Sequence, residues 1–323
     1  MTAGMATSRL RRTTSGLEVL CWAGFDERLV DVFVTTRGGG VSGGGCTSLN
    51  LSLRVGDDNA AVLANRVRAA AALGATLDDF VFCAQTHSPN VAVVTHEHRG
   101  RGARSASDAI PLTDGLVTTT PGLVLAVLAA DCVPVVLHDP VAGVLACVHA
   151  GWRGTVRGAT PAAVTAMRRL GGDPRNVVVG VGPSITPDRY QVGAEVVDAV
   201  RAALGGRADA VLRPDGLGKW TFDVAGANTL QLVAAGVPEN QIHRTGLGTG
   251  PDTPFFSHRA ENPCGRFAAV ARLRGQRRCD RGSVASQEAA VPGALSGQRA
   301  REDRQIARPE AVVPGALRGK DVL

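Results

Sequence analysis

Short apolar runs rich in β-branched residues alternate along the chain with longer segments whose apolar residues recur at helical spacing. The runs that predict strands lie at 17–25, 29–37, 79–98 (two strands around a turn at 88–90), 133–137, 144–148, 177–185 and 254–273. The segments that predict helices lie at 59–74, in the second half of 152–172, at 192–206 and at 222–237. Strands and helices that alternate irregularly, together with a hairpin, predict an α+β fold with mixed β-sheets and flanking helices.

The hairpin is expected where two apolar runs, 133–137 and 144–148, are joined by the turn-forming segment HDPVAG. If the turn is centred just after Pro140, Cys132 falls directly opposite His149. Directly opposed residues share one face of the sheet, with Cβ atoms roughly 4.5 to 5.5 Å apart. That spacing suits two ligands of one metal ion, although a buried free cysteine and a hydrogen-bonded histidine would leave the same pattern.

A third donor, His87, follows an apolar run and precedes the turn at 88–90. We therefore expect His87, Cys132 and His149 to lie at strand ends. Three ligands of this kind with an open fourth position are typical of a catalytic zinc site. His96 and His98 stand further from any apolar run and are expected at the surface.

The net charge of +6 belongs to the two ends of the chain. Residues 1–16 carry three Arg and no acidic residue, and residues 277–323 carry nine Lys or Arg and six Asp or Glu. The part between them is therefore neutral, and the whole chain has only 4% aromatic residues, so the folded part does not have the composition of a nucleic-acid-binding protein. The glycine-rich stretch at 38–45 has neither the GxGxxG spacing nor the GK[ST] ending of nucleotide-binding loops.

No apolar stretch reaches the ~18–20 residues of a membrane span, and the start of the chain lacks the apolar region of a signal peptide. Seven scattered cysteines without CxxC spacing fit reduced thiols rather than a disulfide framework. We therefore expect a cytoplasmic protein that binds neither membranes nor nucleic acid.

Three parts of the chain are expected. Residues 1–16 form a disordered N-terminal segment, and 17–275 form one folded domain of layered sheets and helices. Residues 276–323 form a disordered basic tail, in which EAAVPGAL at 288–295 recurs as EAVVPGAL at 310–317.

Several sequence blocks carry a family resemblance: TTRGGGVSGGGCTSLNLSLRVGDD, QTHSPNV, ADC, VHAGWRGTVRGA, GVGPSI, YQVGAEV and FFSHRAENPCGRFA. In this order they resemble the YfiH family, also called the multicopper polyphenol oxidase or laccase-domain family, over about residues 19–275. The resemblance implies a single α+β domain with a zinc ion held by His87, Cys132 and His149. One feature departs from the family, since the Cys-Thr that often precedes FFSHR is absent.

The resemblance implies phosphorolysis of purine nucleosides with zinc as the cofactor, and adenosine deamination as a side activity. The expected partners are a purine nucleoside and phosphate. Arg37 beside the glycine-rich stretch and Arg153 after Trp152 are candidates for phosphate binding, or alternatively for structural salt bridges. By the same resemblance, Ser48 and Asn50 are expected to line the substrate pocket.

Three alternatives stay open. Copper oxidation is the literal meaning of the family's older name, but seven histidines with one HxH pair are too few for four copper ions, so copper is the less favoured metal. Amide hydrolysis on a cell-wall precursor would use the same zinc site. A zinc-stabilised binding module would use the metal for folding alone. The sequence does not predict the oligomeric state.

Overall fold

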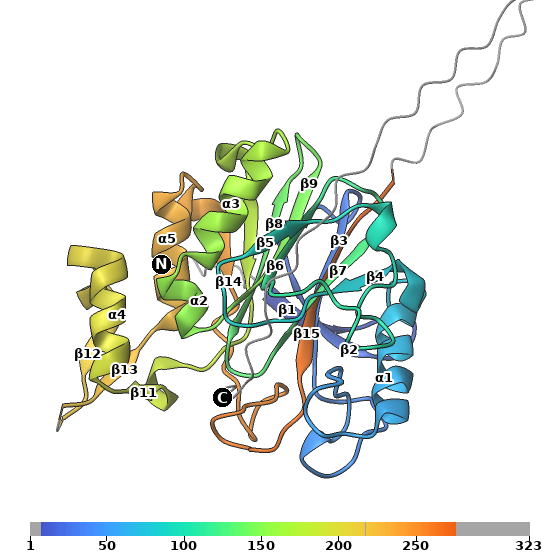
Figure 1. Ribbon diagram of the computed structural model, residues 1–323, viewed down its shortest axis with the longest axis horizontal. Helices are drawn as coiled ribbons and strands as arrows, with labels where there is room; N and C mark the ends of the chain where they lie inside the picture. Colours follow the sequence, from blue (N-terminus) through green and yellow to red (C-terminus); the bar gives the residue numbers. More distant parts are fainter. Residues whose placement is uncertain (1–7, 217, 276–323) are drawn as a thin grey trace, which may run out of the picture. The chain divides into compact units, whose positions relative to one another are not determined.

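The computed structural model describes residues 8–216 and 218–275 (Figure 1). The predicted basic tail with its repeated segment lies outside the described residues. None of the helices within the described ranges is long and apolar enough to cross a membrane.

The first sheet has six strands in the order β1-β2-β3-β15-β7-β4. Their bounds are Ser8–Arg12 (β1), Glu18–Trp22 (β2), Val30–Thr35 (β3), Phe267–Leu273 (β15), Val124–Ala129 (β7) and Phe80–Phe82 (β4). The last strand along the chain, β15, lies between β3 and β7 and pairs antiparallel with both. The end of the domain is therefore part of its core.

The second sheet also has six strands, in the order β14-β10-β8-β9-β6-β5. Their bounds are Ile242–Arg244 (β14), Val178–Val181 (β10), Val133–Asp139 (β8), Val144–Ala150 (β9), Gly115–Thr118 (β6) and Val91–Val93 (β5). The predicted hairpin is confirmed as β8 and β9, every residue of which is buried. The two strands expected around the turn at 88–90 are β4 and β5, and they belong to different sheets.

The two large sheets pack face to face, so strand residues alternate between two buried environments. In β9, Leu145 and Cys147 point to the first sheet, whereas Val144, Ala146 and Val148 pack in the core that includes the helices. Because both faces of these strands are buried, their sequences read as continuous apolar runs rather than as alternating patterns. This packing confirms the predicted α+β architecture with mixed sheets.

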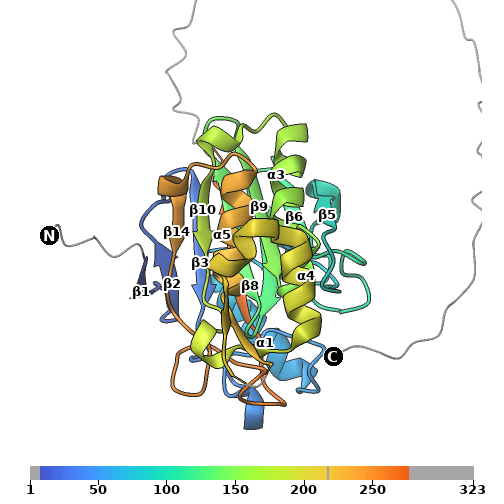
Figure 2. The same cartoon turned by 90° about the vertical axis from the view of Figure 1, so that its left-hand side faces the viewer.

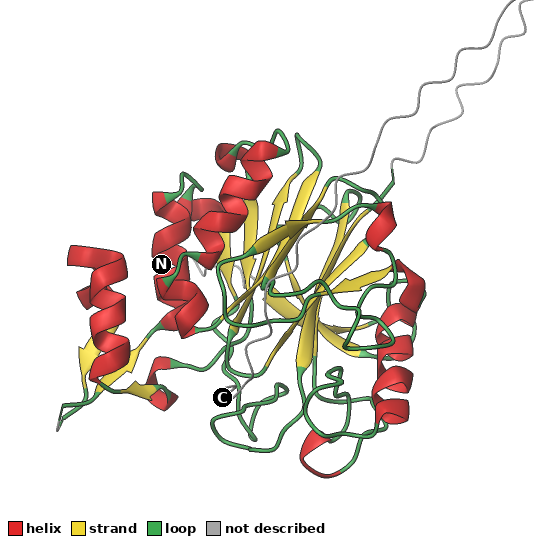
Figure 3. Ribbon diagram, viewed as in Figure 1, coloured by secondary structure: helices red, strands yellow, loops and turns green. Residues whose placement is uncertain are grey.

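Helices cover the outer faces of both sheets. Figures 1 and 3 show α1 on one side of the strands and α2, α3 and α5 on the other, and Figure 2 shows α3, α4 and α5 in front of the second sheet. Their bounds are Asn59–Ala71 (α1), Trp152–Val156 (α2), Ala159–Arg169 (α3), Ala194–Leu204 (α4) and Val224–Ala234 (α5). A small sheet of β11 (Gln191–Val192), β13 (Trp220–Phe222) and β12 (Leu212–Pro214) accompanies α4. Short 3₁₀ turns lie at Gly44–Cys46, Leu77–Asp79, His96–His98, Pro174–Asn176, Pro187–Arg189, Gly205–Ala210 and Glu239–Gln241.

Local signals place α1 as the sequence predicts. Asp58 caps the helix by accepting hydrogen bonds from the backbone N–H groups of Ala60 and Ala61. Gly74, just beyond the end, has the positive φ of +59° that favours glycine. The segment 152–172 differs from its prediction, because α2 makes its first part helical as well and Gly158 separates α2 from α3.

The N-terminal segment is also more ordered than the sequence indicated. The prediction of disorder through residue 16 is wrong for residues 8–12, which form β1 and pair antiparallel with β2. Most β1 side chains are exposed, so apolar burial does not hold this strand. The strand is held instead by main-chain hydrogen bonds to β2 at the edge of the sheet. Side-chain composition does not reveal such bonds.

Candidate metal centre

Three donor atoms from remote parts of the chain meet at one point. Cys132 directly precedes β8, His149 lies near the end of β9, and His87 lies in the loop between β4 and β5. One ligand atom from each side chain lies within 4.8 Å of the other two. Cys132 Sγ is 3.8 Å from His87 Nε2, and the two imidazole rings are 5.0 Å apart between centroids. The structure therefore brings together the three residues that the sequence proposes as ligands.

The register of the hairpin differs from the prediction. His149 faces Pro134, not Cys132, because four residues rather than two form the loop between Asp139 and Val144. Asp139 Oδ1 stabilises this wider loop by accepting hydrogen bonds from two of its backbone N–H groups. The shift is two residues, and an even shift keeps every side chain on its face of the sheet. Cys132 therefore stays beside His149, on the diagonal.

His87 also differs from its predicted position. It does not lie at a strand end, since β4 ends at Phe82 and His87 is in the following loop. Its φ of 57° is in the left-handed region, which few residues other than glycine adopt. Such a conformation persists where surrounding contacts impose it.

Asp114 supplies those contacts. Its fully buried carboxylate accepts hydrogen bonds from the backbone N–H groups of Thr86, His87 and Ser88, at 2.7 to 3.0 Å. The same carboxylate lies 2.9 Å from His149 Nδ1, which donates to it. Asp114 thus fixes two of the three candidate ligands and leaves His149 Nε2 for a metal, the usual arrangement of a carboxylate behind a metal-binding histidine.

Sequence reasoning missed Asp114. Burial by itself would raise the pKa of this carboxyl, but the hydrogen bond and the charge of His149 outweigh it and hold the pKa below its usual range. The signal that could have identified the residue is an aspartate placed directly before an apolar strand, in TDGLV. A buried carboxylate there requires hydrogen-bond donors.

The half-buried Cys132 and the buried His149 also influence each other's charge. Burial would raise the pKa of the Cys132 thiol, but the charge of His149 and hydrogen bonds from both histidines lower it to about 6. Burial would lower the pKa of His149, but Cys132 and Asp114 raise it to about 9. The thiolate is therefore favoured near neutral pH, and the thiolate is the form of cysteine that binds metals.

Gly151 provides the space for this cluster. A Cβ atom at this position would lie 2.6 Å from Cys132 Sγ and 2.8 Å from His87 Cδ2. Any larger residue would displace two ligands. Two imidazoles and one thiolate in a site kept free of other side chains are a donor set that suits zinc, with one coordination position left over.

Asp131, next to Cys132, connects the centre to a distant loop. Its φ of +85° is left-handed, and its carboxylate accepts hydrogen bonds of 2.6 Å from Thr249 Oγ1 and from the backbone N–H of Arg259. Its carbonyl oxygen accepts a hydrogen bond from the Ile185 N–H. Segments around 185, 249 and 259 are thereby held beside the candidate metal ligands.

Comparison with known proteins places this geometry in a family. The family model described as "Multi-copper polyphenol oxidoreductase laccase" matches residues 31–274. The chain belongs to this family. The resemblance to YfiH proteins that the sequence blocks indicated is thus confirmed.

Members of the family carry several names. Over 230 residues the chain is 40% identical to "Purine nucleoside phosphorylase YlmD" of Geobacillus stearothermophilus, covering 71% of this chain and 84% of the relative. It is 41% identical over 231 residues to "Adenosine deaminase RL5" of an unknown prokaryotic organism, covering 71% and 88%. The crystal structure of the Bacillus licheniformis hypothetical protein YfiH superposes with a TM-score of 0.77 at 34% identity, covering 79% of this chain and 96% of that one.

Arg37, a predicted phosphate-binding residue of this family member, is engaged elsewhere. Its guanidinium makes a two-pronged ion pair with Glu261, at 3.0 and 3.1 Å, and lies 4.7 Å from the centre of the Phe256 ring. These contacts are those of the structural salt bridge that was the alternative interpretation. Its role in phosphate binding stays a prediction.

Ser48 and Asn50 bind the backbone of their own loop region. Ser48 Oγ accepts a hydrogen bond from the Gly40 N–H and donates one to the Arg37 carbonyl. Asn50 is completely buried, and its amide bonds to Ser52, Asp57 and Arg266. Because Asn50 has no exposed surface, its side chain does not line an open pocket in this structure.

Arg153, the second predicted phosphate-binding residue, lies in the first turn of α2, two residues after Gly151. Its guanidinium stacks 4.3 Å from the centre of the Trp152 ring. The same region contains Tyr190, whose ring is 5.2 Å from the guanidinium of Arg259. Sequence reasoning missed both Tyr190 and Arg259, although both stand in the blocks that resemble the family.

Tyr190 is a buried phenol whose pKa is influenced by charged neighbours. Burial is the main reason that its pKa is raised, and the charge of Cys132 raises it further, whereas Arg259 and Arg153 lower it. The phenol therefore stays protonated near neutral pH.

The two remaining histidines considered as ligands lie apart from the centre. His96 and His98 form one 3₁₀ turn, in which His98 Nδ1 accepts a hydrogen bond from the Thr95 N–H. Within the described ranges, the group formed by His87, Cys132 and His149 is the single cluster of its kind.

Proposed function

We propose that the protein is a zinc-dependent purine nucleoside phosphorylase, with adenosine deamination as a side activity. The observation that carries the proposal is the triad of His87, Cys132 and His149, with donor atoms within 4.8 Å of one another. Relatives named purine nucleoside phosphorylase and adenosine deaminase, each about 40% identical, support the choice of substrate. Copper oxidation finds less support, because one three-ligand cluster among the described residues cannot hold four copper ions.

Zinc held by these three residues would keep one coordination position for a reactant and act there as a Lewis acid. The chain's own residues prepare the site. Asp114 holds the His149 ring and the backbone of the His87 loop in place. Cys132 acts as a ligand and not as a nucleophile, because a metal-bound thiolate is poorly available for attack.

Phosphorolysis forms a bond between a phosphate oxygen and C1′ of the ribose while the bond from C1′ to the purine nitrogen breaks. The phosphate needs cationic partners, and Arg153 and Arg259 supply two guanidinium groups in the neighbourhood of Tyr190. The departing base must gain a proton, and the phenol of Tyr190, which is protonated near neutral pH, carries one. Arg153 is a stronger candidate than Arg37, whose guanidinium is paired with Glu261.

The test incubates the purified full chain with adenosine, inosine or guanosine in the presence and absence of phosphate, and separates the products by chromatography. Phosphorolysis predicts free base and ribose 1-phosphate in equal amounts, and only when phosphate is present. Free ribose without ribose 1-phosphate would mean that water is the acceptor and would contradict the proposal. Metal analysis of the same preparation identifies the bound ion.

The variant Cys132→Ser distinguishes an enzyme from a zinc-stabilised binding module. A catalytic centre predicts a folded protein that has lost its metal and its turnover. If the wild type turns over no nucleoside and Cys132→Ser unfolds, the binding module is favoured. If the wild type turns over no nucleoside but cleaves an amide bond of a muramyl peptide, cell-wall editing is favoured.

A further inference from the structure

We propose that a second, separate pocket binds a small, neutral, hydroxyl-rich molecule. The cavity has a volume of about 110 Å³, smaller than the ~300–1,000 Å³ typical of sites for drug-sized ligands, and therefore suits a small molecule. It lies where the parallel strands β10 and β14 end and α5 begins. Its lining comprises Val181, Gly182, Ser184, Ile185, Thr186, Pro187, Asp223, Ala225, Arg244, Thr245, Gly246 and Leu247. None of the three candidate metal ligands takes part.

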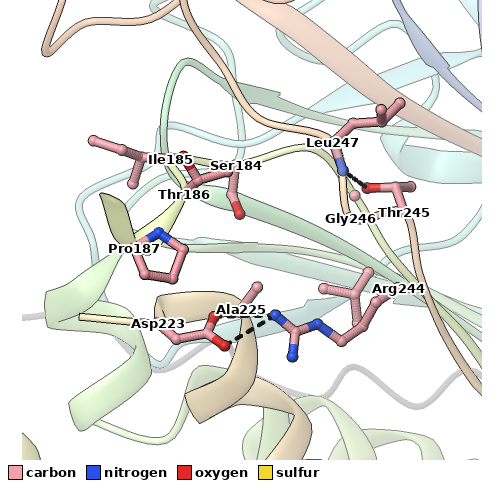
Figure 4. A pocket seen from close by; sticks show the side chains of 12 residues that line it. Ser184, Ile185, Thr186, Pro187, Asp223, Ala225, Arg244, Thr245, Gly246 and Leu247 are labelled. Carbon is pink, nitrogen blue, oxygen red and sulfur yellow. Dashed lines mark hydrogen bonds and ion pairs between the residues drawn. The ribbon is translucent and has the colours of Figure 1, made fainter. Parts of the chain in front are cut away.

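The hydroxyl group of Ser184 points into this cavity without a partner. Figure 4 shows it directed from one wall towards the opposite wall, where Asp223 and Arg244 lie. Ser184 is only 5% exposed, and no hydrogen bond to its side chain is found among the described residues. The hydroxyl oxygen is not among the fully enclosed, unpartnered side-chain atoms of the described residues, so it is accessible from the pocket and can bond to a ligand there.

The opposite wall presents a donor and an acceptor side by side. Arg244 Nη2 lies 3.0 and 3.1 Å from the two carboxylate oxygens of Asp223, which also caps α5 by accepting from the Gly226 N–H. Both side chains are partly exposed, 42% for Arg244 and 26% for Asp223, so each has surface that a ligand can contact.

This charge arrangement selects the class of ligand. An anion would face the Asp223 carboxylate, and a cation would face Arg244 and the positive end of the α5 dipole. A neutral molecule with adjacent hydroxyl groups satisfies both, because each hydroxyl donates to a carboxylate and accepts from a guanidinium. Ile185, Pro187 and Leu247 add apolar surface for the carbon face of a sugar ring. Ribosyl hydroxyls, of a free pentose or of a nucleoside, meet this description.

The pocket has a structural connection to the metal centre. Ile185, in its wall, donates its backbone N–H to the carbonyl oxygen of Asp131, the residue before Cys132. The wall continues through the 3₁₀ turn at Pro187–Arg189 to Tyr190. A ligand in the pocket would therefore contact a segment that is hydrogen-bonded next to Cys132. Binding in the pocket does not require that the protein catalyses phosphorolysis.

The experiment titrates the full chain with D-ribose, adenosine or inorganic phosphate and follows binding by ligand-observed NMR. Wild type is compared with Cys132→Ser, in which a site that needs the metal is removed. Ser184→Ala deletes the free hydroxyl, and Ala225→Leu fills the cavity from α5. Ser107→Ala is the matched control, because Ser107 is exposed and its hydroxyl bonds only to the nearby Ser105.

We expect saturable binding of D-ribose or adenosine by both wild type and Cys132→Ser. Ser184→Ala should weaken it about three- to tenfold, as for loss of one hydrogen bond, without lowering the melting temperature. Ala225→Leu should abolish it, and Ser107→Ala should leave it unchanged. The probe that binds more tightly tells whether a free sugar or a nucleoside is preferred. Failure of both probes to bind wild type, binding that survives Ala225→Leu, or competition by phosphate would overturn the proposal.

Discussion

The substitution Gly151→Ala tests the metal centre with a single methyl group. Gly151 has φ −75° and ψ 175°, a conformation that alanine adopts without strain, so the effect is steric alone. The new Cβ would lie 2.6 Å from Cys132 Sγ, whereas ordinary contacts begin at 3.4 Å. The sulfur or the backbone must therefore move by the difference of 0.8 Å.

Metal–ligand distances tolerate deviations of only about 0.2 Å, so this displacement removes Cys132 from the coordination shell. His87 Cδ2, 2.8 Å from the same Cβ, is displaced as well. Loss of a residue that only hydrogen-bonds to a metal-binding side chain already costs about 10- to 100-fold in metal affinity. We expect Gly151→Ala to weaken zinc binding about 100-fold or more, which corresponds to about 2.7 kcal/mol.

The control is Gly154→Ala, three residues further along the same turn. A Cβ at Gly154 would meet its nearest neighbour at 3.6 Å, an ordinary contact, and alanine favours the helical conformation of α2. Zinc affinity is measured by competition with a chromophoric chelator, and melting temperatures are recorded with and without EDTA. Gly154→Ala should behave as wild type does. Wild-type zinc affinity in Gly151→Ala would refute the assignment of this cluster as a metal site.

Further predictions concern the carboxylate, the thiol and the salt bridge. Asp114→Asn should lower zinc affinity about 10- to 100-fold in the chelator assay, because His149 loses its charged partner; unchanged affinity would exclude the positioning role. In metal-stripped protein, iodoacetamide should alkylate Cys132 rapidly at neutral pH, and the rate should fall as the pH drops through about 6, because the lowered pKa keeps the thiol ionised down to that pH. A midpoint of the rate profile near the ordinary pKa of 9.0 would contradict the interaction of the thiolate with His149. If Arg37 has a structural role, thermal unfolding should show that the double variant Arg37→Met/Glu261→Gln is destabilised by less than the sum of the two single variants. The KM of Arg37→Met for phosphate should equal that of the wild type.

Several features of the fold follow from short-range patterns. The β8–β9 hairpin, the capped helix α1 and the alternation of strands with helices are confirmed because each depends on residues close together in the sequence. The three candidate ligands could also be proposed from the sequence, because their residue types are those that bind metals. The predicted hairpin register was wrong by two residues, but an even error leaves Cys132 and His149 on the same face of the sheet.

Contacts between remote segments were decided only in three dimensions. Arg37 and Glu261 are 224 positions apart, and β15 pairs with strands from the first half of the chain. Asp114 reaches His149 and the His87 loop from a third element. The Ser184 hydroxyl lies across a pocket from Arg244 (Figure 4).

The sequence by itself therefore determined which residue types offer metal-binding atoms and which local elements carry them. Only the tertiary structure decided how those atoms are held, which partner pairs with Arg37 and where an additional pocket lies. The physical reason is that propensity and periodicity act between near neighbours, whereas hydrogen bonds and ion pairs across the core depend on the pairing of whole sheets.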